Sequence, residues 1–392
     1  MVSVEEAKSK LAAIQVSLKT ISIDVSSSIG YVLASDVVSA IDMPPFPQSA
    51  MDGYALGKGT RTAATTFKVI GEIAAGSSAE IDLSENECVR IFTGAPVPES
   101  AIAVVQQEWV ERDGSTIVLN NDVDKSKNIR PRGEQIKTGS VALKKETLIK
   151  PATIGFMNML GVTEVSVYSK PSVAILVTGN ELISAGEQLN YGQVYESNAD
   201  MLASALANEG ITATTIKVKD ELKETTQTIK SALAQFDTLI ISGGISVGDY
   251  DYVGRALNDL SVRQVFYKVA QKPGKPLYVG IWEDKTVFAL PGNPAASLTC
   301  YYEYVLPVIR RYYGRSDINL VTLNLPFASG KVPKIGRAQF LKALVSNGEV
   351  HILEGQSSAM LNTFAQSNAL IYVKPNSSQP QIGEPLEVHL LP

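Results

Sequence analysis

Three loops of the chain combine glycine with carboxylate or helix-capping side chains, as phosphate-binding loops often do. They are Thr178–Glu181, Ser242–Asp251 and Leu290–Pro294. Glycine lets the backbone approach a ligand closely, and a helix N-terminus offers free N–H groups to phosphate. The carboxylates suited to holding Mg²⁺ against phosphate oxygens are Glu181, Asp249 and Asp251. Each loop alone also fits a simple strand-to-helix turn, but three such loops together favour a ligand site.

A basic segment between the second and third loops offers ammonium groups to an anion. Lys272 and Lys275 belong to the run Lys272–Pro276, in which two prolines fix the backbone and a glycine bends it. Two positive charges held in this way can bind one anion. The alternative interpretation is a solvated surface turn.

Further loops rich in glycine and proline occur nearer the N-terminus. Pro44–Tyr54 changes from stiff to flexible, so it either presents Asp52 at a fixed angle or acts as an ordered linker. Thr93–Pro96 and Asn128–Glu134 follow, and the second of these contains two arginines. Arginine binds phosphate through its planar guanidinium fork, although surface-exposed arginines are equally common.

The elements that must position the three glycine loops alternate between strand and helix. Strands are expected at 172–177, 211–218, 238–242 and 286–290, an extended segment at 265–269, and helices at 197–208, 221–236, 250–260 and 294–312. The first of these helices is expected to begin with a Ser/Asn cap, and the last with Asn293 as its cap and Pro294 at its first position. This alternation predicts a doubly wound, parallel α/β sheet. Ligands bind such sheets beyond the carboxyl ends of the strands, which is where the three loops lie.

The rest of the chain divides around this α/β segment, expected at 169–317. Residues 1–40 and 138–168 contain helical patterns and are expected to form one helical or linker domain. An inserted β-rich domain is expected at 41–137, because short β-like runs there are broken by proline and glycine. Residues 318–392 are expected to be all β, and Asn347-Gly348 between two apolar runs predicts a hairpin.

Composition limits the chemistry that the chain can perform. The 392 residues include 45% hydrophobic and 19% charged residues, which is ordinary for a globular protein, and we expect a cytoplasmic enzyme that contacts no membrane. Two cysteines and two histidines exclude a disulfide framework and point to a hard cation held by oxygens. The net charge of −5 gives no support for nucleic-acid binding. From the residues alone, we predict a Mg²⁺-dependent enzyme that acts on a phosphorylated small molecule, with sites on more than one domain.

The loops also carry a family likeness that covers nearly the whole chain. PPFPQSAMDGYA, TGAPVP, NIRPRGE, TGNEL, SGGISVGDYDY, KPGKP, LPGNPAAS and IGRAQFLKA occur in this order. Together they resemble the MoeA family of molybdopterin molybdenumtransferases, which includes the E domain of gephyrin. The resemblance implies a helical dimerisation piece, the inserted β domain, the α/β domain and a C-terminal β-barrel.

The resemblance also implies an activity and its partners. It implies a homodimer with its active site in a cleft between subunits, and Mg²⁺ as the metal. Molybdate and adenylylated molybdopterin would be the substrates, AMP would be released, and molybdenum would remain on the dithiolene. Contacts with molybdopterin adenylyltransferase and with apo-molybdoenzymes are further expectations.

Site residues follow from the resemblance by their positions in the matching motifs. The expected catalytic residues are Asp52, Thr93, Glu181, Asp220 and Asp251, with Glu181 and Asp251 as metal ligands. The expected substrate-binding residues are Arg130, Gly243, Gly244, Ser246, Asp249, Pro291, Gly292, Asn293 and Pro294. The expected molybdate-binding residues are Lys272, Lys275, Pro276, Arg337 and Ser358.

Two glutamines depart from the family pattern. Gln135 and Gln48 stand where the family usually has acidic residues, and glutamine brings no charge to a metal. Either Glu134 or Asp52 compensates, or the activity is altered. Two alternatives remain: a molybdopterin adenylyltransferase, which shares the α/β domain, or a gephyrin-like scaffold without catalysis, which Gln135 would permit.

Overall fold

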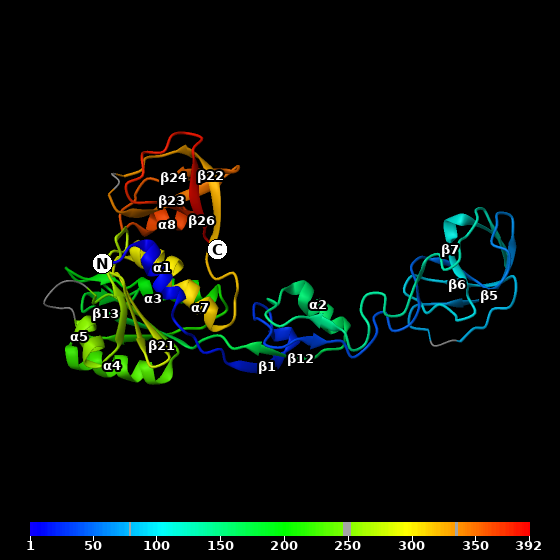
Figure 1. Ribbon diagram of the computed structural model, residues 1–392, viewed down its shortest axis with the longest axis horizontal. Helices are drawn as coiled ribbons and strands as arrows, with labels where there is room; N and C mark the ends of the chain where they lie inside the picture. Colours follow the sequence, from blue (N-terminus) through cyan, green and yellow to red (C-terminus); the bar gives the residue numbers. More distant parts are fainter. Residues whose placement is uncertain (78–79, 246–251, 334–335) are drawn as a thin grey trace.

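The computed structural model describes residues 1–77, 80–245, 252–333 and 336–392. The chain is elongated (Figure 1), with an α/β domain and a β-barrel at one end and a second β domain at the other. A small region containing α2 (Pro151–Met159) and the strand pair β1 (Thr20–Asp24) and β12 (Glu164–Tyr168) joins the two ends. The short helix η1 (Val25–Ser27) belongs to this connecting region.

The α/β domain is built on a six-stranded sheet in the order β16-β13-β17-β21-β20-β18. The strands are β13 (Val173–Thr178), β16 (Thr214–Val218), β17 (Thr238–Ser242), β18 (Arg263–Tyr267), β20 (Tyr278–Trp282) and β21 (Lys285–Leu290). The first four strands in the sheet order are parallel. All residues of β13 and β17 are buried, as expected for strands covered on both faces.

Helices cover both faces of this sheet, which confirms the doubly wound fold predicted from the sequence. One face packs against α3 (Asn198–Ala207), α6 (Pro294–Cys300) and α7 (Leu306–Tyr312) through residues such as Ile175. The π-helical turn η3 (Tyr301–Val305) joins α6 to α7. The other face packs against α4 (Leu222–Gln235) and α5 (Tyr252–Asp259) through residues such as Leu176. Alternate residues of β13 thus serve opposite cores.

The sequence analysis missed β20, which runs antiparallel between β21 and β18. A two-residue turn connects β20 to β21, with Glu283 at a φ of 55°. No helix separates these two strands, so the strand–helix alternation that identified the others was absent. The run of prolines and glycines just before Tyr278 further concealed the strand.

The N-terminal helix α1 (Val4–Ala12) belongs by its contacts to the α/β domain. Val4, Ala7 and Leu11 are buried in the same core as Ile175. The remainder of the connecting region has its own small core around Leu33, Met157 and Val167. Within it, β2 (Val37–Val38) pairs with β11 (Val141–Leu143).

The second β domain contains a six-stranded sheet in the order β7-β4-β6-β5-β9-β8. Its strands are β4 (Gly53–Leu56), β5 (Thr66–Ile73), β6 (Glu87–Ile91), β7 (Ala103–Gln106), β8 (Val110–Asp113) and β9 (Thr116–Leu119). The short helix η2 (Gln107–Trp109) follows β7, and β3 (Gln48–Ser49) pairs with β10 (Ile129–Arg130). Two apolar clusters lie on opposite faces of this sheet.

The C-terminal region forms a closed barrel, as the family resemblance implied. Its strands are β22 (Val321–Ser329), β23 (Ala338–Ser346), β24 (Glu349–Ile352), β25 (Ala369–Val373) and β26 (Pro385–Leu390), and β23–β25 pairing closes it. The helix α8 (Leu361–Gln366) precedes β25. Asn347 and Gly348, with φ of 52° and 80°, form the predicted hairpin turn between β23 and β24.

A buried charge network joins the barrel to the α/β domain and to α1. Glu303, only 3% exposed, contacts Lys8 through Oε2 at 2.7 Å and His389 Nδ1 through Oε1 at 2.7 Å. Burial opposes the charged form of His389, but the hydrogen bond and charge of Glu303 outweigh it and raise the histidine pKa. Burial likewise opposes ionised Glu303, yet His389 and Lys8 lower its pKa.

In the described part of the chain, no helix is long and apolar enough to cross a membrane.

This network predicts how stability depends on pH. His389 has a raised pKa, so its contribution is complete below its ordinary value of 6.5 and disappears as pH rises through the raised value. The Tm should therefore fall on the alkaline side, and His389→Asn should remove that part of the pH dependence. Equal alkaline slopes of Tm for the native chain and His389→Asn would contradict this account.

The substitution Glu303→Gln should cost about 3–5 kcal/mol of unfolding free energy, because it leaves Lys8 and His389 without their buried partner.

Candidate functional site

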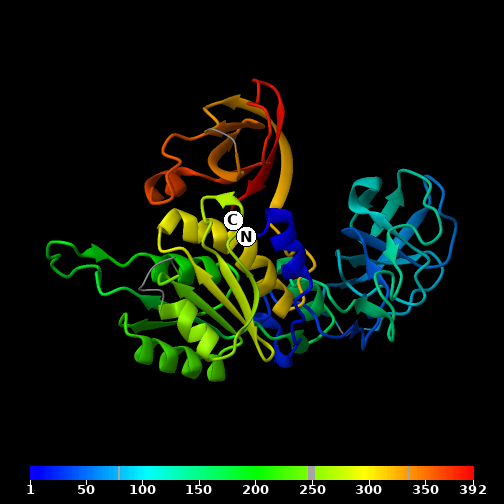
Figure 2. The ribbon, with the colours of Figure 1, turned by 60° about the vertical axis from the view of Figure 1, so that its left-hand side comes forward.

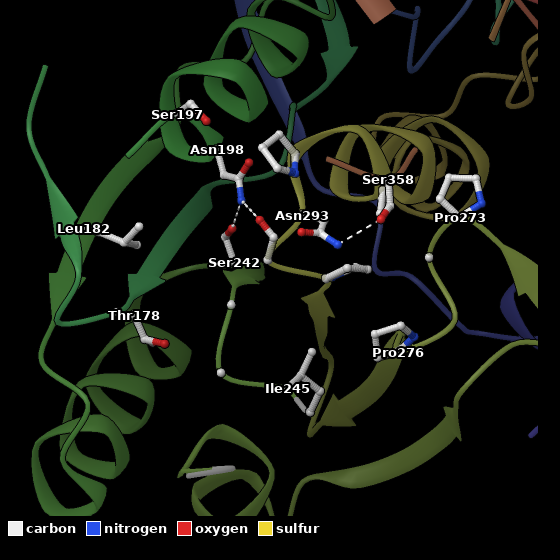
Figure 3. Close-up of a pocket in the computed structure, with 18 of the residues that line it drawn as sticks. Thr178, Leu182, Ser197, Asn198, Ser242, Ile245, Pro273, Pro276, Asn293 and Ser358 are labelled. Atoms are coloured by element: carbon white, nitrogen blue, oxygen red, sulfur yellow. Dashed lines mark hydrogen bonds between the residues drawn. The ribbon is translucent and has the colours of Figure 1, made fainter. Parts of the chain in front are cut away.

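The main cleft lies beyond the carboxyl ends of β13, β17 and β21 and has a volume of about 860 Å³. Figure 3 shows side chains from these strand ends and from neighbouring loops arranged around it. Its wall includes part of the barrel, because Arg337 and Ser358 line it together with residues of the α/β domain. The cleft thus occupies the position that an open α/β sheet offers to a ligand.

Most of the residues expected to bind substrate, molybdate or metal line this one cleft. They are Glu181, Asp220, Gly243, Gly244, Lys272, Lys275, Pro276, Pro291, Gly292, Asn293, Pro294, Arg337 and Ser358. Ser246, Asp249 and Asp251 lie outside the residues that the structure describes. The carboxyl ends of three neighbouring strands therefore account for much of the predicted site.

Asp52, Thr93 and Arg130 do not line the cleft but belong to the second β domain, which lies far from the α/β domain in Figure 1. Asp52 Oδ1 accepts hydrogen bonds from the backbone N–H and the hydroxyl of Thr93, both at 2.8 Å. These bonds lower the pKa of Asp52 and keep it ionised. All three residues are exposed, so they are free to contact a ligand.

One end of the cleft is cationic because of a short pairing between the two domains. The strand β19 (Gln271–Lys272) lies parallel to the start of β23, with Lys272 opposite Gln339. This register brings the loop of residues 272–276, the lysine loop, beside Arg337, the residue just before β23. Among the described residues, no carboxylate forms an ion pair with Lys272, Lys275 or Arg337. Three exposed cations with no acidic partner make this end a site for anions.

Hydrogen bonds of buried polar side chains hold the lysine loop in place. Gln271, fully buried, donates from Nε2 to the carbonyl of Pro273 at 2.9 Å, and its Oε1 accepts from the hydroxyl of Tyr304. Gly274, at a φ of 87°, packs so closely that an added Cβ would lie 2.5 Å from Cys300 Sγ. The buried Cys300 therefore serves packing, as its raised thiol pKa from burial also indicates. A rigid loop keeps the two lysines near one another.

The other end of the cleft is acidic. Glu181 follows β13 and is exposed, and Asp220 follows β16 with its backbone N–H bonded to Asn180 Oδ1 at 3.3 Å. Glu196 also lines the cleft, and its Oε1 accepts from the N–H groups of Asn198 and Ala199 at 2.7 and 2.9 Å. Oxygen donors of this kind fit a hard cation. No group of three metal-ligating residues is assembled among the described residues.

Two helix starts differ from the expected capping. A Ser/Asn cap was predicted before α3, but Ser197 makes no capping bond and the Glu196 carboxylate performs that task instead. Asn293 was predicted to cap α6, but its side chain makes no capping bond and donates to Ser358 Oγ at 2.9 Å. The side chains of Ser197 and Asn293 are thus not used for capping and are available to organise the cleft.

The expected site residues did not include Thr178, although it begins the first glycine loop, or Asn198, and both also line the cleft. Asn198 Nδ2 donates to Ser242 Oγ and to the Gly292 carbonyl, each at 2.8 Å, and thereby ties β17 to the third glycine loop (Figure 3). Thr178 Oγ1 and Asn198 Oδ1 are buried and form no hydrogen bond with any residue that the structure describes. Asn198 had a sequence signal, but it was interpreted as a helix cap.

Comparison with protein families covers the chain almost end to end. Residues 2–161 match the MoeA N-terminal region (domain I and II). Residues 174–311 match a model described as a probable molybdopterin binding domain, and residues 325–391 match the MoeA C-terminal region (domain IV). The three matches occur in the same order as the parts of the structure described above.

Individual relatives agree with this assignment. The chain is 34% identical over 319 residues to a molybdopterin molybdenumtransferase of Staphylococcus epidermidis, covering 80% of this chain and 76% of the relative. A Staphylococcus aureus protein of the same name is 34% identical over 323 residues, covering 81% and 77%. The solved structure of the molybdopterin biosynthesis MoeA protein from Pyrococcus horikoshii OT3 aligns over 100% of both chains, with 27% identity and a TM-score of 0.85. The chain therefore belongs to the MoeA family of molybdopterin molybdenumtransferases.

Proposed function

We propose that the chain inserts molybdenum into molybdopterin, using molybdate and an adenylylated molybdopterin and releasing AMP. The observation that carries this proposal is the division of one cleft into a cationic end and an acidic end. Molybdate is a tetrahedral dianion, which suits Lys272, Lys275 and Arg337 with the hydroxyl of Ser358. The phosphoanhydride linkage would lie towards the acidic end.

Glu181 is the described residue best placed to hold a divalent cation, because it is an exposed carboxylate that lines the cleft two residues after Gly179. When bound, Mg²⁺ would neutralise phosphate charge at the anhydride. Asp251, the other expected ligand, lies outside the described residues. In the reaction, the oxygen of a water molecule attacks the adenylyl phosphorus, the anhydride P–O bond breaks, AMP leaves with the water oxygen, and the molybdopterin phosphate departs with the electron pair of the broken bond. The cations at the other end orient molybdate, in which two Mo–O bonds are replaced by two Mo–S bonds to the dithiolene, and the displaced oxygens leave as water with the two thiol protons and two protons from solvent.

A second copy of the chain would complete the site. Asp52, Thr93 and Arg130 lie on a domain that does not contact the cleft within one chain. A two-fold dimer can bring that domain of one copy to the cleft of the other, because a symmetric interface creates two equivalent composite sites. Asp52 would then contribute an ionised carboxylate to the acidic end.

The direct test supplies purified chain with adenylylated molybdopterin, Mg²⁺ and molybdate, and follows AMP and active cofactor together. Release of both that depends on molybdate is expected. Consumption of ATP with metal-free molybdopterin would instead support an adenylyltransferase. Substrate binding without either product would support a scaffold.

Arg337→Ala should raise the KM for molybdate by about tenfold or more, because one charge-assisted contact to the dianion is lost. The kcat at saturating molybdate should change much less. Arg337 is exposed, so the fold should persist. Arg263→Ala, which removes an exposed arginine from β18, is the matched control and should leave this KM unchanged. An unchanged KM in Arg337→Ala would remove this residue from the anion site.

Mixing two variants, assayed at a molybdate concentration far below the KM of Arg337→Ala so that each alone has little activity, tests the composite site. Asp52→Asn and Arg337→Ala chains, unfolded and refolded together, should form mixed dimers in which one of two sites has both native residues. Activity should return to about a quarter of the native value, because half the dimers are mixed and each has one intact site. No recovery, with mixed dimers verified by mass, would place both residues in a site formed by one chain.

A further inference from the structure

Lys342 on β23 has a buried ammonium group that is held entirely by one loop of the barrel. The residue is 4% exposed. Its Nζ donates to the carbonyls of Gly355, Ser357 and Met360 at 2.7, 3.1 and 2.9 Å. An ammonium group has three donors, and all three are used here. Among the described residues, no carboxylate pairs with it, and burial lowers its pKa.

The same loop is fixed to the backbone of Lys342 by Gln356. The Oε1 of Gln356 accepts from Lys342 N–H at 3.0 Å, and its Nε2 donates to the carbonyls of Lys342 and Leu353 at 2.8 and 2.7 Å. The side chain and the backbone of Lys342 therefore together hold residues 355–360 in place. This segment includes Ser358, which lines the cleft.

The orientation of the Ser357–Ser358 peptide follows from the contact with Lys342. In a planar trans peptide, the C=O and the following N–H point in opposite directions. Because the Ser357 carbonyl points to Lys342 Nζ, the Ser358 N–H points away from it. In the described ranges of the chain, this N–H donates to no other group. It is a fixed donor in a residue that borders the cleft.

The Ser358 side chain is oriented at the same time. Its Oγ accepts from Asn293 Nδ2 at 2.9 Å (Figure 3). Its carbonyl accepts from Ala296 N–H at 3.2 Å. The hydroxyl proton is therefore left to donate elsewhere. Ser358 thus offers two donors, N–H and O–H, in the cleft that Lys275 and Arg337 also line.

We propose that Lys342 is a positioning residue for oxyanion binding: its ammonium group fixes the loop so that both donors of Ser358 address the anion. This inference rests on the proposed function, in which that anion is molybdate. Fixed donors bind an oxyanion better than mobile ones because they need no reorganisation on binding. A cation held only by neutral carbonyls also leaves its positive charge uncompensated near the anion.

Lys342→Met tests this role, because it keeps an unbranched apolar stem of similar length and removes the ammonium group. The KM for molybdate should rise about tenfold or more, while kcat at saturating molybdate and the KM for adenylylated molybdopterin change less than about twofold. Lys374→Met, which replaces an exposed barrel lysine, is the control and should change neither KM.

Hydrogen–deuterium exchange gives a readout that does not require turnover. With the native chain, molybdate alone should slow exchange in the peptide containing residues 354–360. In Lys342→Met, this peptide should exchange faster and gain no protection at the same molybdate concentration. If Lys342→Met does not fold, Lys342→Arg retains the cation but offers planar donors to a trigonal set of carbonyls, and its KM for molybdate should still rise severalfold.

The outcomes separate this inference from the proposed function. If the native chain shows no molybdate protection and no molybdate-dependent turnover, the proposed function fails. If the native chain shows both and a folded Lys342 variant binds molybdate as tightly, Lys342 has no positioning role. A uniform loss of kcat with an unchanged KM for molybdate would also overturn the inference.

Discussion

The parallel pairing of Gln271 and Lys272 with Ala338 and Gln339 is the constraint on which the candidate site depends. It joins the lysine loop of the α/β domain to the first residues of a barrel strand. Other contacts, such as that of Glu303 with His389, also join the two domains, but this register is what places Arg337 beside the lysines. Two backbone pairs therefore determine which charges meet at the cationic end of the cleft.

Buried polar contacts on both sides of this pairing keep the cationic end rigid. Gln271 and Tyr304 brace the lysine loop, and Lys342 and Gln356 brace the Ser358 loop. Polar groups in such positions cost free energy unless every donor and acceptor has a partner. Apart from the hydroxyl of Tyr304 in η3, the partners are atoms of the two loops and of Lys342, so these polar groups hold the loops in position.

The sequence predicted the α/β fold well, because strand–helix alternation and glycine loops are local signals. It located the glycine loops at strand ends, and the structure places them around one cleft. Contacts between distant segments left no local signal. Lys342 occurs in an ordinary strand pattern, and only the barrel register shows that its side chain meets residues 355–360. Asn198 stands at the predicted start of a helix, where an asparagine is typical of a helix cap, so its position in the sequence did not indicate its role in the cleft.

Crystals of the chain grown with molybdate and measured at the molybdenum absorption edge test the central claim most directly. The account predicts an anomalous peak in the cleft, contacted by Lys275, Arg337 and both donors of Ser358. A peak at another place, or none at saturating molybdate in crystals with an open cleft, would contradict the assignment of this cationic end as the oxyanion site.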